Sequence, residues 1–115
     1  MVVDKLPGVD HDLIFHALAD ATRRDILARA IVREQSVSAL ATHYEMSFAA
    51  VQKHVAVLER ASLITKRRHG RERIVHGNPS TLTSAASLLA HYQQLWIERA
   101  ERIADVLADE KGATA

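Results

Sequence analysis

The side chains with the clearest chemical potential are basic, and they are concentrated in one short segment. Residues 47–77 contain seven Lys and Arg residues and two acidic residues, a net charge of +5. The remainder of the chain contains eight basic and twelve acidic residues, a net charge of −4. Such a concentration of positive charge is expected where a protein meets a polyanion such as nucleic acid. A solvated basic face is the alternative, and charge alone does not separate the two.

Other kinds of chemistry find little support in the sequence. The absence of cysteine excludes a disulfide framework, a thiol nucleophile and a thiolate metal site. The four glycines are scattered, and no nucleophile–base pair or carboxylate cluster stands out, so we expect no enzyme and no cofactor. No two of the seven histidines have the HxxxH spacing of a helical metal site. His91, Glu98 and Glu101 are metal-ligand candidates, but a solvated helix with a Glu98–Arg102 pair explains them more simply.

Length and composition predict one domain with a modest core. The chain has 115 residues, 48% hydrophobic and 25% charged. No apolar run approaches the roughly 20 residues of a membrane span, and the first residues, MVVDKLPGVDHD, lack the pattern of a signal peptide. We therefore expect a single domain over residues 1–115, ordered over about 9–109. The expected location is the cytoplasm, with nucleoid association when the protein is bound to DNA and no membrane contact.

Apolar periodicity predicts four helices in the first half of the chain. The first covers about residues 9–19. The second opens on a capping box formed by Thr22 and Asp25, and the third is capped by Ser36 or Ser38 and runs to about residue 44. The fourth is capped by Ser47 and reaches about residue 61. The apolar stripes of the second and fourth helices are Ile26, Leu27, Ala30 and Ile31, and Val51, Val55 and Leu58.

A hairpin and one long helix follow. Residues 63–67 and 73–76 read as two strands joined by a polar turn that contains Gly70. Asn78 is suited to cap a helix and Pro79 to open one, so the last helix is predicted over residues 79–109. At about 1.5 Å per residue this helix is about 45 Å long, more than a domain of this size covers.

The apolar stripe of the last helix therefore predicts a homodimer. A bent helix folded back over a monomeric core is the alternative. The residues expected at the dimer interface are Leu13, Ala17, Leu82, Leu89, Tyr92, Trp96 and Ile103.

The fourth helix is predicted to read DNA with its outer, N-terminal face. Gln52 can pair with an adenine edge, Lys53 with guanine or phosphate, and Ala49 can touch a thymine methyl group. Ser47 and the helix N-terminus are suited to a phosphate. Phe48 either contacts DNA or covers the core, whereas His54 is expected to be packed and hydrogen-bonded rather than bound to DNA. The hairpin adds a cluster around Gly70, in which arginines can bind phosphates or enter the minor groove; its predicted DNA-binding residues are Arg67, Arg68, His69, Arg71 and Arg73.

Two segments resemble the ArsR/SmtB family of repressors. Residues 17–27 (ALADATRRDIL) are similar to the family's second helix, and residues 47–64 (SFAAVQKHVAVLERASLI) to its recognition helix and the start of its wing. The likeness covers about residues 9–109. Ala21 replaces a common proline, Ser62 replaces the usual glycine, and residues 36–44 lack the cysteine motif of the metal-sensing members.

The resemblance implies a winged helix-turn-helix, mainly α with a small β-hairpin wing, and a long C-terminal dimerisation helix. The expected function is sequence-specific binding of double-stranded DNA by a homodimeric repressor, often of its own operon, at an inverted repeat. The inducing signal is either a small molecule bound near the dimer helices or none. A winged helix that binds an acidic protein partner is the alternative.

Overall fold

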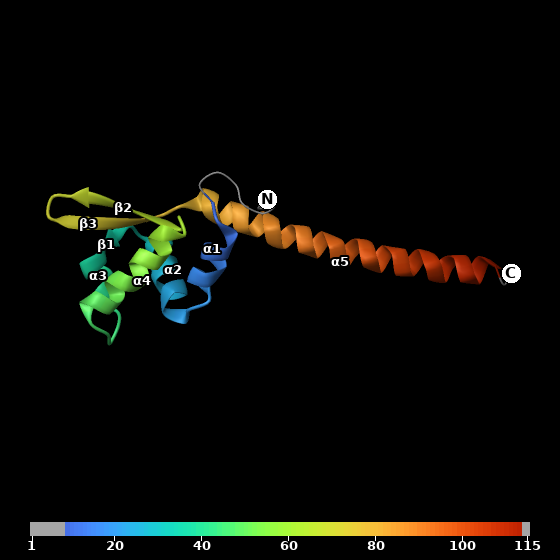
Figure 1. Cartoon of the computed structure of the whole chain (residues 1–115), viewed down its shortest axis with the longest axis horizontal. Coiled ribbons are helices and arrows are strands. Elements are labelled where there is room, and N and C mark those ends of the chain that lie inside the picture. Colours follow the sequence, from blue (N-terminus) through green and yellow to red (C-terminus); the bar gives the residue numbers. More distant parts are fainter. Residues whose placement is uncertain (1–8, 114–115) are drawn as a thin grey trace. The chain divides into compact units, whose positions relative to one another are not determined.

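The computed structural model describes residues 9–113, which form five helices and three short strands (Figure 1). In chain order they are α1 (His11–Leu18), α2 (Ala21–Val32), β1 (Gln35–Ser36), α3 (Val37–Ala41), α4 (Phe48–Arg60), β2 (Ile64–His69), β3 (Glu72–Gly77) and α5 (Pro79–Ala113). The chain divides into two units at Ala85 and Ala86. We call residues 9–85 the body and residues 86–113 the distal helix. The predicted winged helix-turn-helix, mainly α with a small antiparallel sheet, is confirmed.

Helix starts in the body are set by short polar side chains that accept hydrogen bonds from backbone amides. Ser47 caps α4 as predicted, with its Oγ 3.1 Å from the Ala50 nitrogen. Of the two candidates for α3, Ser36 is the cap. The capping box predicted at Thr22 is wrong, because α2 begins at Ala21 and Thr22 is already inside the helix. Its cap is Asp20, whose carboxylate accepts from the Arg23 amide at 2.9 Å.

The three strands form an antiparallel sheet in the order β1-β3-β2. The β2–β3 hairpin is longer than predicted, since His69 pairs with Glu72 and leaves a two-residue turn of Gly70 and Arg71. Gly70 has φ of +64°, which glycine adopts without the strain of a side chain. Strand β1 was not predicted. Its two residues pair with Val75 and Ile74, so they join α2 and α3 to the hairpin.

The core of the body is formed by all of its helices and by the sheet. Fully buried side chains include Ile14 of α1, Ile26 of α2, Leu40 of α3 and Val75 of β3. The predicted stripe of α4 is confirmed, because Val51, Val55 and Leu58 are all 0% exposed. The stripe of α2 is narrower than predicted, since Ile31 is 53% exposed.

Ser62 joins the end of α4 to the start of α5. Its φ of 62° is left-handed, and the amides of Ser62 and Leu63 bond to the carbonyls of Glu59 and Leu58 at 2.9 and 3.0 Å. This is a Schellman motif, in which glycine is usual because a side chain costs about 1 kcal/mol there. The Ser62 carbonyl in turn accepts a 2.6 Å hydrogen bond from the buried hydroxyl of Thr81.

Helix α5 begins at Pro79 as predicted and continues to Ala113, beyond the predicted end at residue 109. Its first turns belong to the body, where Ala85 is buried and Ser84 Oγ lies 3.1 Å from Nε2 of His11. In the distal helix every side chain from residue 89 to residue 112 is exposed.

Candidate nucleic-acid interface

The outer face of α4 is held outward by its buried inner face. Because Val51, Val55 and Leu58 pack into the core, Gln52 and Lys53 on the other side of the helix project to solvent. All five predicted contact residues are exposed, and Phe48 is 46% exposed. They are Ser47, Phe48, Ala49, Gln52 and Lys53.

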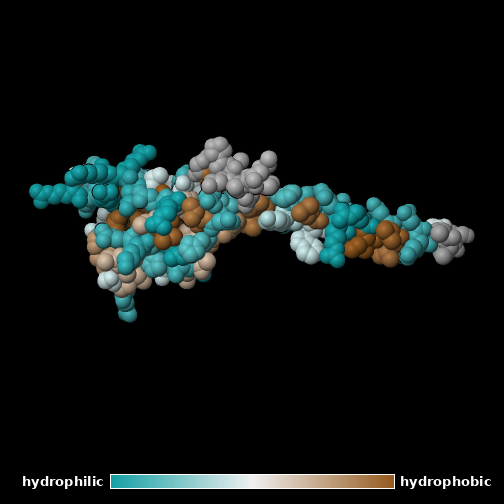
Figure 2. All heavy atoms as spheres, viewed as in Figure 1, coloured by the Kyte–Doolittle hydropathy of each residue, from teal (hydrophilic) through white to brown (hydrophobic). Residues whose placement is uncertain are grey.

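A groove of about 410 Å³ lies between α4, α3 and the hairpin. Phe48 and Gln52 line it from α4, and Arg71 and Arg73 line it from the hairpin. Figure 1 shows the hairpin beside α3 and α4, and Figure 2 shows its hydrophilic surface. The structure thus brings together side chains that the sequence placed in two separate motifs. Sequence reasoning missed three further polar lining residues, Ser38, Lys66 and Glu72.

The cationic residues of the hairpin lie on both faces of the sheet. Arg68 pairs with Arg73, so these two side chains share one face. Arg67, one residue earlier, points to the opposite face and lines a different hollow with Thr65 and His76. His69 lies two residues after Arg67 in β2, and alternate residues of a strand point to the same face. Arg68 and Arg73 therefore share one face and Arg67 lies on the other, while Arg71, in the turn, lines the groove directly.

His54 of α4 is partly buried and hydrogen-bonded, as predicted. Nη1 of Arg23 lies 3.3 Å from its Nδ1, which must accept because a guanidinium only donates. The same guanidinium donates to the carbonyls of Ala17 and His16 at 2.8 and 3.1 Å, so Arg23 joins α1, α2 and α4. Asp20 lies 3.9 Å from His54 Nδ1, and its pKa is lowered chiefly by the Arg23 amide. These contacts link α4 to α1 and α2.

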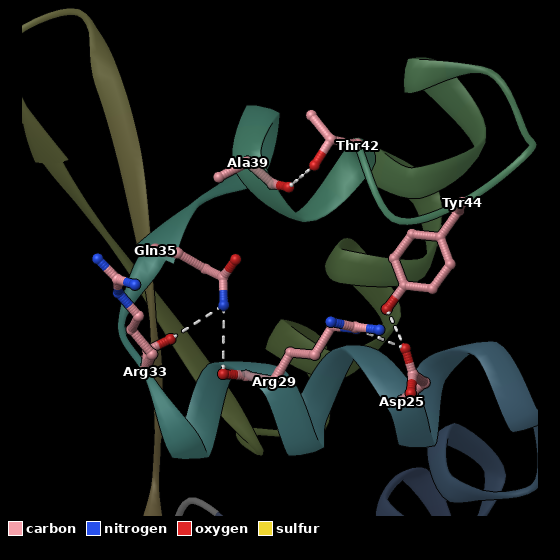
Figure 3. A network of polar contacts seen from close by, with 7 residues as sticks. All are labelled: Asp25, Arg29, Arg33, Gln35, Ala39, Thr42 and Tyr44. Carbon is pink, nitrogen blue, oxygen red and sulfur yellow. Dashed lines mark hydrogen bonds and ion pairs between the residues drawn. The ribbon is translucent and has the colours of Figure 1, made fainter.

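A second polar network ties the loop before α4 to α2 (Figure 3). The Tyr44 hydroxyl donates to Asp25 at 2.6 Å, and Arg29 donates to the same carboxylate at 2.8 Å. Burial, followed by the bond to Asp25, raises the pKa of Tyr44 to about 12. The hydrogen bond from Tyr44, followed by that from Arg29, lowers the pKa of Asp25. Gln35 closes the end of α2 by donating to the Arg29 and Arg33 carbonyls at 3.3 and 3.2 Å.

The predicted dimer residues differ in how much surface they expose. Ala17 is 0% exposed and packs within the body, so it is removed from the predicted dimer surface. Leu82 is half-buried against the core, and Leu13 is 36% exposed. The other four, Leu89, Tyr92, Trp96 and Ile103, lie on the distal helix and are 51–65% exposed.

Within residues 9–113, no three His, Cys, Asp or Glu side chains are grouped closely enough to hold a metal ion. The predicted Glu98–Arg102 pair does not form; instead, the nearby Arg99 stacks on Trp96. None of the described helices is both long and apolar enough to cross a membrane.

Two curated relatives of this chain are helix-turn-helix regulators. No family profile matches the chain. An uncharacterized HTH-type transcriptional regulator of Bacillus subtilis is 38% identical over 78 residues, which cover 62% of this chain and 85% of the relative. An HTH-type transcriptional regulator of Mycobacterium tuberculosis is 31% identical over 99 residues, covering 86% of this chain and 90% of the relative.

Solved structures are similar over most of the chain. An ArsR family transcriptional regulator is 33% identical with a TM-score of 0.72, covering 80% of this chain and 94% of its own. An ArsR-like regulator from Rhodococcus is 30% identical with a TM-score of 0.75, covering 84% and 91%. A homodimeric winged helix-turn-helix DNA-binding domain from Mycobacterium bovis, 21% identical with a TM-score of 0.59, covers 72% and 78% and shares the fold.

The fold and these relatives define a DNA-binding transcriptional regulator. The chain belongs to the ArsR family of transcriptional regulators. The expectation of a protein that is not an enzyme is confirmed by this membership.

Proposed function

We propose that the protein is a homodimeric repressor that binds an inverted-repeat operator through α4 and the hairpin. The observation that carries this proposal is the groove bordered by both elements, with Gln52 on one wall and Arg71 and Arg73 on the other. A helix presents base-reading side chains in the major groove, while a neighbouring cationic loop neutralises phosphates or enters the minor groove.

The roles proposed for the side chains follow from their chemistry. Gln52 offers the paired donor and acceptor that match adenine, and Ala49 is small enough for close approach to a thymine methyl group. Lys53 takes guanine or phosphate, and Ser47 takes a phosphate at the helix N-terminus. The groove-side arginines of the hairpin, Arg68, Arg71 and Arg73, bind phosphates, with a smaller contribution from Arg67 and His69.

Dimerisation is proposed to use the apolar surface of α5 with Leu13 of α1. The distal helix exposes Leu89, Tyr92, Trp96 and Ile103. Large apolar side chains exposed together on one helix are typical of a surface that contacts a partner. The homodimeric state of the Mycobacterium bovis domain with the same fold supports this arrangement. Two recognition helices related by a two-fold axis then require an inverted repeat, with half-sites about one helical turn apart.

Selection from random-sequence duplexes tests the operator directly. The expected outcome is enrichment of an inverted repeat with half-sites centred about 10 base pairs apart, each duplex carrying two chains by sedimentation. Failure to enrich any sequence, or one chain on a single half-site, would contradict the proposal. Gln52→Ala serves as the specificity control, since it should relax the preference at one base pair in each half-site.

Repression is proposed to arise because the bound dimer occludes the promoter. In vitro transcription from a promoter that contains the selected site is expected to fall as the protein is added. A promoter carrying a scrambled site should be unaffected. An increase in transcript from the first template would show an activator instead.

A further inference from the structure

The distal helix places two unpaired arginines beside the only tryptophan of the chain. The Arg99 Cζ atom lies 5.2 Å from the centroid of the Trp96 ring, a cation–π contact. Among residues 9–113, no carboxylate lies within ion-pair distance of Arg99 or Arg102. These two guanidinium groups, with Tyr92, Leu95 and Trp96, line a hollow of about 310 Å³. That volume is at the lower end of the range for small-molecule sites.

Arg99 is a charged residue at a position of the distal helix where the spacing of the apolar stripe predicts an apolar one. Leu89, Trp96 and Ile103 recur every seven residues, and Tyr92, Arg99 and Val106 repeat the same interval three residues later. This is the a and d pattern of helices that pair along a seam. Arg99 therefore occupies a d position, where an apolar side chain is the rule.

The chain's own nearby carboxylates do not lie on this face. At about 100° per residue, Arg102, Trp96 and Ile103 all fall within about 60° of Arg99 around the helix. Glu98, Asp105 and Glu101 lie at least about 100° away, and Glu110, which shares the face, is three turns further along the helix. Pairing of this face with a second copy would desolvate the Arg99 guanidinium, which is costly unless an anion accompanies it.

We propose that the hollow binds a small monocarboxylate with an apolar body. A guanidinium that stacks on a ring by its flat face still presents its N–H edge, which matches a carboxylate with two parallel hydrogen bonds. Tyr92, Leu95 and Trp96 then pack against the apolar part of the ligand. The carboxylate of the ligand neutralises the charge of Arg99 where the two helices pair, and the dimer is thereby strengthened. The inference rests on the homodimer of the proposed function and assigns a ligand class to its regulation.

The fluorescence of Trp96 tests the site without any added label, because no other tryptophan contributes. Octanoate and octanamide share one apolar chain and differ in charge, and neither absorbs at the excitation wavelength. Octanoate is expected to bind the 115-residue chain about tenfold more tightly than octanamide. Arg99→Gln should abolish this preference. Arg33→Gln, which removes an exposed arginine of the body, should leave it within about twofold. Equal binding of the two compounds, or an unchanged preference in Arg99→Gln, would overturn the proposal.

Two further measurements separate this site from the DNA-binding proposal. In sedimentation experiments octanoate should lower the dimer dissociation constant about tenfold, and octanamide should not; no effect of octanoate would overturn the proposed role in the dimer. Duplex binding is measured in parallel. If the protein binds no duplex but still prefers octanoate, only the operator proposal is refuted. If it binds duplex but shows no preference for octanoate, only the ligand site is refuted. A weaker, less salt-dependent duplex affinity in Arg99→Gln without octanoate would identify Arg99 as a phosphate contact and overturn the ligand proposal.

Discussion

The body and the distal helix differ in what becomes of their apolar side chains. In the body, Ile14, Ile26, Leu40 and Leu58 are all 0% exposed, so each element is held by the others. In the distal helix the large apolar side chains are about half exposed or more, and Trp96 is 65% exposed (Figure 2). An isolated helix gains little stability in water from its own hydrogen bonds. The body is therefore stabilised within one chain, whereas the distal helix has the surface of an element completed by a partner.

The sharpest test of this difference removes one leucine from each region. Leu58→Ala is expected to lower the free energy of unfolding by about 3 kcal/mol, because it opens a cavity in a packed core. Leu107→Ala, at a position that is 55% exposed, is expected to cost less than about 0.5 kcal/mol in the monomer. Urea denaturation followed by circular dichroism at low protein concentration measures both. Equal losses would break the comparison.

A charge in the stripe of the distal helix tests the proposed homodimer. Ile103→Lys is expected to weaken the dimer about 100-fold, since pairing would bury an unpaired ammonium group. The neighbouring Ala104→Lys lies about 100° further round the helix and is expected to change dimerisation by less than about threefold. Sedimentation over a concentration series gives both constants. If the two variants dimerise equally well, the interface lies elsewhere.

The two faces of the hairpin offer a comparison within the body. Arg71→Ala should weaken DNA binding to a similar extent for all sequences and lower the salt slope by about one, as expected for one lost phosphate contact. Arg67→Ala, on the opposite face of the sheet, should have a smaller effect. Fluorescence anisotropy across a salt series measures both slopes. A loss for Arg71→Ala confined to one base position would instead show base reading.

Ser62 tests how the body accommodates a strained turn. Ser62→Gly is expected to stabilise the protein by about 0.5 kcal/mol, because relief of left-handed strain exceeds the entropy that glycine adds to the unfolded chain. Ser62→Val should destabilise it by more than about 1 kcal/mol, since a β-branched residue tolerates positive φ poorly. Thermal unfolding should rank the variants in the order Gly, Ser, Val, and any other order would contradict this explanation.

The smallest effect concerns Tyr44 and appears only in alkali. Because its folded pKa of about 12 lies above its ordinary value of 10.0, its contribution to stability is complete below pH 10 and is lost as the pH rises towards 12. Absorbance at alkaline pH should show one late-ionising tyrosine that Tyr44→Phe removes. Ionisation of Tyr44 at its ordinary pH would mean that the hydrogen bond to Asp25 does not persist in solution.

Local and non-local features differed in how well the sequence predicted them. The Ser47 cap, the buried stripe of α4 and the start of α5 at Pro79 depend on neighbouring residues, and these were predicted correctly. Strand β1 was missed because its two residues are defined by pairing with β3, about 40 residues away. The Thr22 capping box was a pattern match that Asp20, two residues earlier, displaced.

The candidate site shows the same limit. The exposure of Gln52 and Lys53 followed from the helical period, because both lie between Val51 and Val55, which are buried. The groove itself depends on how the hairpin packs beside α3 and α4, which no local pattern encodes. Lys66 and Glu72 therefore became candidates only in the folded structure.

The central claim is sequence-specific DNA binding, and anisotropy with the duplex upstream of the protein's own gene tests it most directly. A scrambled duplex of the same composition is the control, and both are titrated across a salt series. The predicted result is tight binding that prefers the native duplex and weakens steeply with salt. Equal weak binding to both duplexes would contradict a specific operator at that site, and no binding at low salt would contradict DNA binding itself.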